Sequence, residues 1–155
     1  MVYLGLGTNL GDKEQNLRMA VKKIEERIGS VVALSAFYAT APWGFSSENS
    51  FLNAAVGVET TLSPLQVLRE TQRIEREMGR TEKSVNGRYA DRLIDIDLLL
   101  YDDRVMDAEG LILPHPLMTE RRFVMEPLSE IAPDVVHPVL HKTLGELFIS
   151  SFSPQ

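Results

Sequence analysis

Several features are absent from this sequence, and each absence narrows the possible functions. The chain has 155 residues and no cysteine, which excludes disulfides, thiolate nucleophiles and cysteine-based metal sites. Apolar residues nowhere run together for the roughly 18 positions that a membrane-spanning helix needs. Met1 to Gly7 also lack the basic leader and long apolar core of a secretory signal. We therefore expect a cytoplasmic protein that makes no contact with membranes.

Positive charge is in deficit over the whole chain. The formal net charge is −6, which disfavours nucleic-acid binding because that function requires a broad cationic face. Hydrophobic residues make up 44% of the chain, enough for one core, whereas aromatic residues contribute 7%. Composition and length together predict one folded domain over residues 1–155, and we expect a monomer.

The basic residues are nevertheless unevenly distributed. One stretch contains Arg69, Arg73, Arg76, Arg80, Lys83, Arg88 and Arg92, and a second pair is Arg121 and Arg122. The first three alternate with glutamates, as on a solvated helix face. The remaining basic residues can have a different role, the binding of a compact anion, because a protein with a negative net charge can still bind one at a local cluster of positive charge.

Local patterns predict a mixed fold. Apolar residues at alternating or helical spacing, bounded by capping residues and glycines, indicate a strand over 2–7, a helix over 12–29, strands over 31–38 and 50–59, a helix over 63–79 and a strand over 93–101. This βαββαβ order is typical of an α+β, ferredoxin-like sandwich, with one antiparallel sheet and its helices on one face. From residue 111 onward we expect a C-terminal extension with short helices near 118–125 and 143–150.

The most informative strand is the acidic one. Asp95 and Asp97 are two apart, so they share one face of a strand that is otherwise aliphatic. Their Cα atoms lie about 7 Å apart, where two unit charges repel by roughly 2 kcal/mol at an effective dielectric of 20. Either the acidic face lies in water or against Arg80 and Arg92, or a cation lies in front of it.

The neighbouring arginines favour a phosphate and metal site. Hard carboxylate oxygens suit Mg²⁺, which completes its coordination with water and substrate phosphates. Arginine binds phosphate oxygens in a bidentate manner and stabilises the charge that develops in phosphoryl transfer. The basic segment that begins at Arg80, together with the acidic strand that follows it, therefore predicts polyphosphate chemistry with two metal ions.

Three other features of the sequence indicate a function less specifically than the acidic strand does. Gly5 and Gly7 allow a ligand or backbone to approach the first strand closely, but the lysine and hydroxyl residue that end a phosphate-binding loop are missing. His115 lies between two prolines that fix its direction, and either a surface role or a ligand contact fits it. Phe51 and Phe123 either fill the core or stack on a planar ligand whose edge Asn53 would bind.

Taken together, these residues resemble a known family, the 6-hydroxymethyl-7,8-dihydropterin pyrophosphokinases of folate biosynthesis. The resemblance spans nearly the whole chain and rests on Gly7-Thr8-Asn9-Leu10-Gly11-Asp12, Phe37-Tyr38-x-Thr40, Phe51-Leu52-Asn53-Ala54-Ala55-Val56, Glu75-x-x-x-Gly79-Arg80, Asp91-Arg92-Leu93-Ile94-Asp95-Ile96-Asp97, Pro114-His115-Pro116 and Arg121-Arg122-Phe123.

The resemblance implies a role for each matching residue. Asp95 and Asp97 would bind two Mg²⁺ ions that bridge the phosphates of ATP, the co-substrate. Phe51 and Phe123 would enclose the pterin, Asn53 would bind its edge, and Thr40 and Trp43 would complete that pocket. The residues implied at the ATP site are Gln72, Glu75, Arg92, His115 and Arg121. Arg80 and Arg92 would act in catalysis beside the two aspartates.

Some positions depart from the family pattern. Tyr89-Ala90-Asp91-Arg92 stands where Trp-x-Pro-Arg is common, and the segment 81–88 is longer, which leaves Lys83 and Arg88 without counterparts. Pro116 replaces a frequent aromatic residue. Two other functions remain open at this point: a ferredoxin-like regulatory module that binds a metabolite without chemistry, and a two-metal nucleotidyltransferase or nuclease, which the net charge disfavours.

Overall fold

The sheet at the centre of the molecule is antiparallel and has five strands. A computed structural model of the chain describes residues 1–40, 50–79, 93–108 and 110–152. The strands are β1 (Val2–Thr8), β2 (Ser30–Leu34), β3 (Tyr38–Thr40), β4 (Phe51–Glu59) and β5 (Asp95–Tyr101). Their order is β2-β4-β1-β5, with β3 paired to β4. The predicted ferredoxin-like order is therefore confirmed, and β5 lies at one edge of the sheet.

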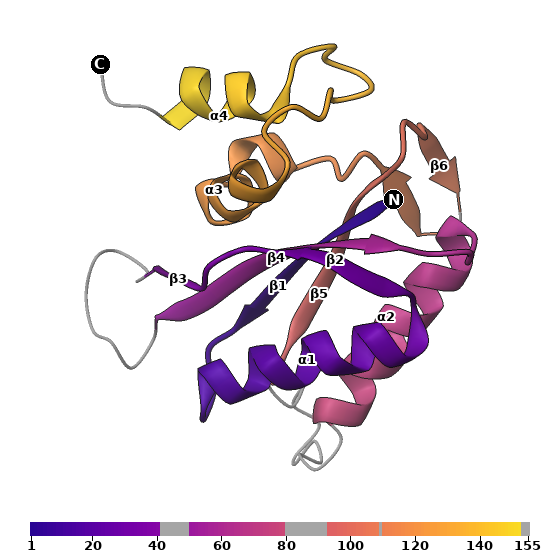
Figure 1. The fold of residues 1–155 in the computed structure, drawn as a ribbon, viewed down its shortest axis with the longest axis vertical. Coiled ribbons are helices and arrows are strands. Elements are labelled where there is room, and N and C mark those ends of the chain that lie inside the picture. Colours follow the sequence, from indigo (N-terminus) through magenta and orange to yellow (C-terminus); the bar gives the residue numbers. More distant parts are fainter. Residues whose placement is uncertain (41–49, 80–92, 109, 153–155) are drawn as a thin grey trace.

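Two helices cover one face of this sheet (Figure 1). They are α1 (Lys13–Arg27) and α2 (Pro64–Gly79). Asp12 caps α1 by accepting the Gln15 N–H at 3.1 Å. Ser63 and Gln66 bond reciprocally at the start of α2, at 3.3 and 2.8 Å. Both caps satisfy backbone donors that a helix start leaves unpaired, which is why the sequence signals place these boundaries correctly.

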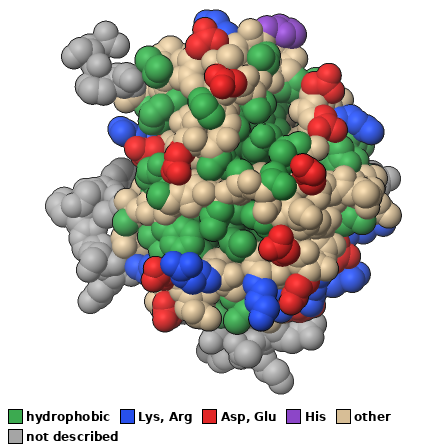
Figure 2. Space-filling model, viewed as in Figure 1, with side chains coloured by type: hydrophobic (Ala, Val, Ile, Leu, Met, Phe, Trp, Pro, Cys, Tyr) green, Lys and Arg blue, Asp and Glu red, His purple; other side chains and the backbone are tan. Residues whose placement is uncertain are grey.

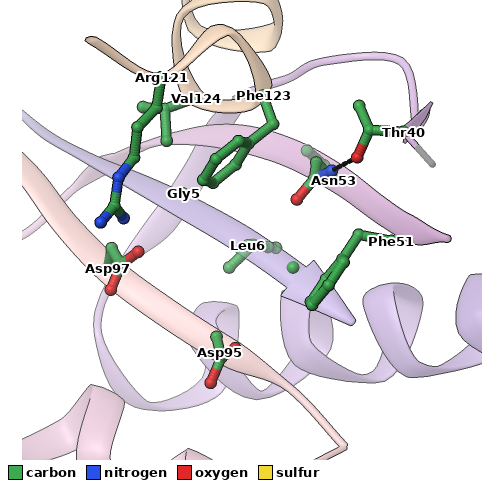
Figure 3. A pocket seen from close by; sticks show the side chains of 12 residues that line it. Gly5, Leu6, Thr40, Phe51, Asn53, Asp95, Asp97, Arg121, Phe123 and Val124 are labelled. Carbon is green, nitrogen blue, oxygen red and sulfur yellow. Dashed lines mark hydrogen bonds between the residues drawn. The ribbon is translucent and has the colours of Figure 1, made fainter. Parts of the chain in front are cut away.

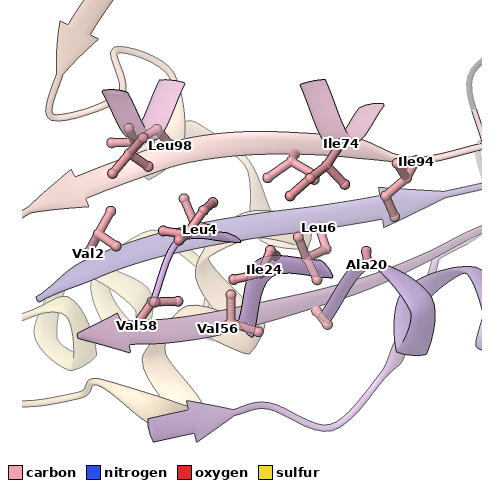
Figure 4. Close-up of a cluster of buried hydrophobic side chains, with 14 of the residues drawn as sticks. Val2, Leu4, Leu6, Ala20, Ile24, Val56, Val58, Ile74, Ile94 and Leu98 are labelled. Atoms are coloured by element: carbon pink, nitrogen blue, oxygen red, sulfur yellow. The ribbon is translucent and has the colours of Figure 1, made fainter. Parts of the chain in front are cut away.

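The main core lies between these helices and the sheet (Figure 4). Val2, Leu4 and Leu6 alternate along β1 and are buried against Ile24 of α1 and Ile74 of α2. The intervening residues of β1 point to the opposite face, because successive side chains on a strand alternate. Leu4 and Ile24 are fully buried, and this packing fixes which face of β1 is left for a ligand.

The second face of the sheet is also covered, which corrects the prediction that helices pack on one face only. The 3-10 helix η3 (Met118–Glu120), α3 (Arg122–Ile131) and α4 (Leu144–Phe152) lie across it. Met125 and Leu128 of α3 are buried against Leu99 and Ala55 of the sheet. The predicted C-terminal extension is present, but these apolar side chains make it a third layer. A hairpin of β6 (Met106–Ala108) and β7 (Leu111–Leu113) precedes this layer.

One predicted strand is divided in two. The prediction of a single strand over 31–38 is wrong, because the chain leaves β2 at Leu34 and resumes as β3 at Tyr38. Ser35 occupies the break: its N–H donates to the Ala55 carbonyl oxygen at 2.9 Å, and its hydroxyl accepts the Ala55 N–H at 2.9 Å. The break turns β3 into a separate short strand at the end of β4.

Charged side chains of both signs are interspersed over α1 on the face shown in Figure 2. None of the described helices combines the length and the apolarity needed to span a bilayer.

The two helices on the first face are tied together by an ion pair, and this link predicts an acid-sensitive contribution to stability. Arg27 of α1 lies 2.5 Å from Glu77 of α2, and Lys23 lies 3.2 Å from the same carboxylate. The hydrogen bond from Arg27 lowers the pKa of Glu77 to about 2. Because the folded pKa is depressed from 4.5, the contribution of Glu77 to stability is complete above pH 4.5 and is lost as the pH falls toward 2.

Urea unfolding should show the wild type losing more stability than Glu77→Gln between about pH 5 and pH 2.5, because the glutamine does not titrate. Parallel curves for the two proteins would contradict this.

Candidate active site

Three strands bring the sequence-predicted site residues into two rows across the sheet. In one row Gly7 of β1 lies between its register partners Asn53 and Asp95, and in the next Gly5 lies between Ala55 and Asp97. Directly paired residues of antiparallel strands point to the same face. Both rows therefore lie on the face away from α1 and α2, and a glycine lies at the centre of each.

A cavity of about 380 Å³ opens above these rows, beside the N-terminal end of α3 (Figure 3). This volume lies within the range of roughly 300–1,000 Å³ that is usual for small-molecule sites. The residues that line the cavity come from five elements and the turn before α3: Gly5, Leu6, Gly7, Thr40, Phe51, Asn53, Ala54, Asp95, Asp97, Arg121, Phe123 and Val124. Most of them are residues that the sequence marks as candidates.

One end of the cavity has aromatic walls and an amide. Figure 3 shows Phe123 extending from α3 toward the sheet, with Asn53 and Phe51 on β4 nearby. Asn53 is 4% exposed, and its side-chain amide donates to the Thr40 hydroxyl at 3.0 Å. A buried, oriented amide beside two aromatic rings can bind the polar edge of a flat heterocycle while the rings cover its faces.

The other end of the cavity is acidic. Asp95 is exposed and Asp97 is half-buried, with the buried Ile96 between them on the opposite face. The Glu75 carboxylate of α2 accepts the Ile96 N–H at 2.7 Å. This bond satisfies a backbone donor on the open edge of β5 and so fixes the strand between the two aspartates.

Arg121 and His115 lie close to Asp97. Figure 3 shows the Arg121 guanidinium directed toward Asp97, and the same group lies 5.6 Å from the centre of the Phe123 ring. Burial lowers the pKa of His115, although the nearby Asp97 opposes that shift. The His115 Nδ1 accepts the Leu117 N–H at 3.2 Å, so a neutral ring carries its proton on Nε2.

The predicted residues do not all meet in the cavity. Thr40, Phe51, Asn53, Asp95, Asp97, Arg121 and Phe123 line it. Glu75 reaches the β5 backbone instead, and Gln72 is exposed on α2. Trp43, Arg80, Lys83, Arg88 and Arg92 lie outside the described residues. Val124 also lines the cavity, although the sequence does not mark it as a site residue. The only signal for it is its position on the buried side of α3.

The fold and the cavity define a class of protein: a ferredoxin-like α+β domain with a cavity of small-molecule size between its sheet and α3. The family model described as 7,8-dihydro-6-hydroxymethylpterin-pyrophosphokinase (HPPK) matches residues 3–133, and the chain belongs to this family.

Two relatives agree with this assignment. A 2-amino-4-hydroxy-6-hydroxymethyldihydropteridine pyrophosphokinase of Porphyromonas gingivalis is 50% identical over 140 residues, which cover 89% of this chain and 94% of the relative. The enzyme of the same name from Aquifex aeolicus is 39% identical, with 94% and 88% covered.

Among solved structures, the wild-type HPPK-DHPS of Plasmodium falciparum with pteroate has a TM-score of 0.78 at 17% identity. The match covers 98% of this chain and 42% of that one, so the chain spans less than half of the fusion protein. At this identity the likeness supports the fold alone.

Proposed function

We propose that the chain transfers the diphosphate of ATP to the hydroxymethyl group of 6-hydroxymethyl-7,8-dihydropterin and releases AMP, a step of folate biosynthesis. Family membership supports this ATP-dependent diphosphokinase activity. The observation that carries the proposal is that one cavity joins the aromatic and amide residues to the aspartate pair. A hydroxymethyl group on a ring held at the aromatic end would project toward the acidic end.

The aromatic end would bind the pterin. Phe51 and Phe123 would cover the two faces of the ring, and Asn53 would bond to its polar edge. Thr40 supports this arrangement because it accepts a hydrogen bond from the Asn53 amide and leaves the amide oxygen available. The family resemblance implies that Trp43, which lies outside the described residues, would complete the pocket.

The acidic end fits Mg²⁺. Two carboxylates on one face of β5 provide hard oxygen ligands, and Mg²⁺ commonly takes only one or two carboxylates together with water and phosphate oxygens. Asp95 and Asp97 would hold two ions, which would neutralise phosphate charge when bound. Gln72, Glu75, Arg92, His115 and Arg121 would contribute to the ATP site, with Arg80 and Arg92 acting on the transferred group.

The transfer itself requires positioning more than covalent catalysis. The hydroxymethyl oxygen forms a bond to the β-phosphorus, the bond from that phosphorus to the oxygen shared with the α-phosphorus breaks, and that oxygen leaves with AMP. The hydroxyl proton passes to solvent. Arg121 lies near both the Phe123 ring and Asp97, where it can orient a phosphate beside the bound ring.

A product assay tests the proposed activity. The chain is incubated with Mg-ATP and the dihydropterin, and the nucleotide products are separated. AMP formed in equal amount to the pterin diphosphate is expected. ADP, or no nucleotide product, would favour a metabolite-binding module or another phosphotransferase and would overturn the proposal.

We propose a single domain over residues 1–155 that is monomeric and cytoplasmic. Sedimentation velocity at several concentrations tests the monomer, and a concentration-dependent rise in mass would contradict it.

A further inference from the structure

Glu130, in the last turn of α3, bonds to the segment that leads into β3. Its carboxylate accepts the Tyr38 hydroxyl at 2.6 Å and the Ala36 N–H at 3.1 and 3.3 Å. The hydrogen bond to Glu130, with a smaller effect of burial, raises the pKa of Tyr38 to about 12. One side chain therefore joins a helix of the third layer to a three-residue strand on the ligand side of the sheet.

Both partners of this link lead directly to walls of the cavity. Phe123 precedes Glu130 by seven residues, or about 10 Å along the same side of the helix. Tyr38 is two residues before Thr40, and in the β3–β4 ladder Tyr38 pairs with Asn53 while Thr40 pairs with Phe51. The Glu130 carboxylate thus connects the element that carries one aromatic wall to the strands that carry the other.

The link is not required to hold α3 in place. Met125 and Leu128 are fully buried in the core beneath the helix. In contrast, β3 has three residues, none of them fully buried, and pairs with β4. An exposed carboxylate adds little to global stability, but it can fix the position of such a short strand relative to a helix that is already anchored.

We infer that Tyr38 and Glu130 are positioning residues that set the distance between the two walls of the pterin site. This inference rests on the proposed function, because it concerns the affinity of the same cavity for its planar substrate. Neither side chain lines the cavity, so both would act through Thr40, Phe51 and Phe123.

The test compares pterin and nucleotide affinity in the full-length chain. Titration calorimetry with the dihydropterin, in the presence of Mg²⁺ and α,β-methylene ATP, should show Glu130→Ala raising the pterin Kd by about fivefold. Tyr38→Phe should raise it by about threefold, because the Ala36 bonds remain. Glu130→Gln retains an acceptor and should stay within about twofold. The Kd of the nucleotide analogue alone should not change.

The matched control is Glu126→Ala on the same helix. Glu126 pairs with Arg122 of α3 at 3.4 Å and influences Tyr38 of β3 only through its charge, so its loss removes the same charge as Glu130→Ala and should leave the pterin Kd unchanged. In the double variant Tyr38→Phe/Glu130→Ala, the loss should not exceed that of Glu130→Ala alone.

Two results would overturn the inference. The first is an equal pterin Kd for the wild type and Glu130→Ala, in an experiment in which the wild type does bind the dihydropterin. The second is a parallel loss of pterin and nucleotide affinity that follows the loss of thermal stability, which would make the link merely structural. A wild type that fails to bind the dihydropterin would refute the proposed function, and the inference with it.

Discussion

Replacing Asp97 with Asn is expected to lower the rate of diphosphate transfer by about 10³-fold, because an amide is a poor Mg²⁺ ligand and several kcal/mol of charge stabilisation are lost. Asp97 lines the cavity and is half-buried. Steady-state assays of AMP release at saturating Mg-ATP measure the effect. Because the side chains are nearly isosteric, the pterin Kd should change little.

The same substitution should not destabilise the fold. Asp95 and Asp97 repel each other by roughly 2 kcal/mol at about 7 Å and an effective dielectric of 20. The substitution removes that repulsion together with the attraction between Asp97 and the Arg121 guanidinium, and these two effects oppose each other. Urea unfolding without Mg²⁺ should therefore give a stability close to that of the wild type. Asp107→Asn, at the exposed position of β6, makes the same Asp-to-Asn substitution away from the cavity and serves as a control. Its activity should match that of the wild type. Near-normal turnover in Asp97→Asn would remove the metal proposal.

Local signals in the sequence are sufficient for most of the fold. Asp12 and Ser63 form the caps that their positions predict, because a cap depends on neighbours within one turn. The break at Ser35 depends instead on two bonds to Ala55, which is distant in the sequence. No local pattern distinguishes this serine from one inside a strand, so the sequence predicts a single strand there.

The third layer escapes sequence analysis for a similar reason. Met125 and Leu128 recur at a helical spacing that predicts a helix with one apolar side, but the spacing does not say what that side covers. Its partner is the face of the sheet that carries Ala55 and Leu99. Only the assembled tertiary structure shows that α3 covers this face and begins at the cavity.

The candidate site is predictable in part. Asp95 and Asp97 stand out because like charges in an aliphatic strand are unfavourable without a reason. Phe51 and Phe123 have no such signal, since aromatic residues usually fill cores, and the family resemblance is needed to pair them. Glu130 gives no signal at all, because its role depends on two donors from a segment far earlier in the chain.

Gly7 lines the cavity between its register partners Asn53 and Asp95. A Cβ placed on Gly7 would lie 3.0 Å from Asn53 Oδ1, so a side chain there forces the buried amide to shift by a few tenths of an ångström and enters the space between Asn53 and Asp95. Gly7→Ala is expected to raise the KM for the dihydropterin by about tenfold, and the larger Gly7→Val by about 100-fold, since a misplacement of about 1 Å in a site can cost about 10²-fold. Initial rates with the pterin varied at saturating Mg-ATP measure both.

Gly57 provides a matched control for steric strain. A Cβ on Gly57 would lie equally close, 3.0 Å from a ring carbon of Tyr3, but Gly57 does not line the cavity. Gly57→Ala should therefore lower the thermal unfolding temperature and leave the KM for the pterin unchanged. If the two alanine variants raise KM equally, the effect of Gly7 is general strain in the sheet. If Gly7→Val retains normal KM, the planar substrate does not lie over β1, because a valine at that position would occupy the space between the amide and the first aspartate.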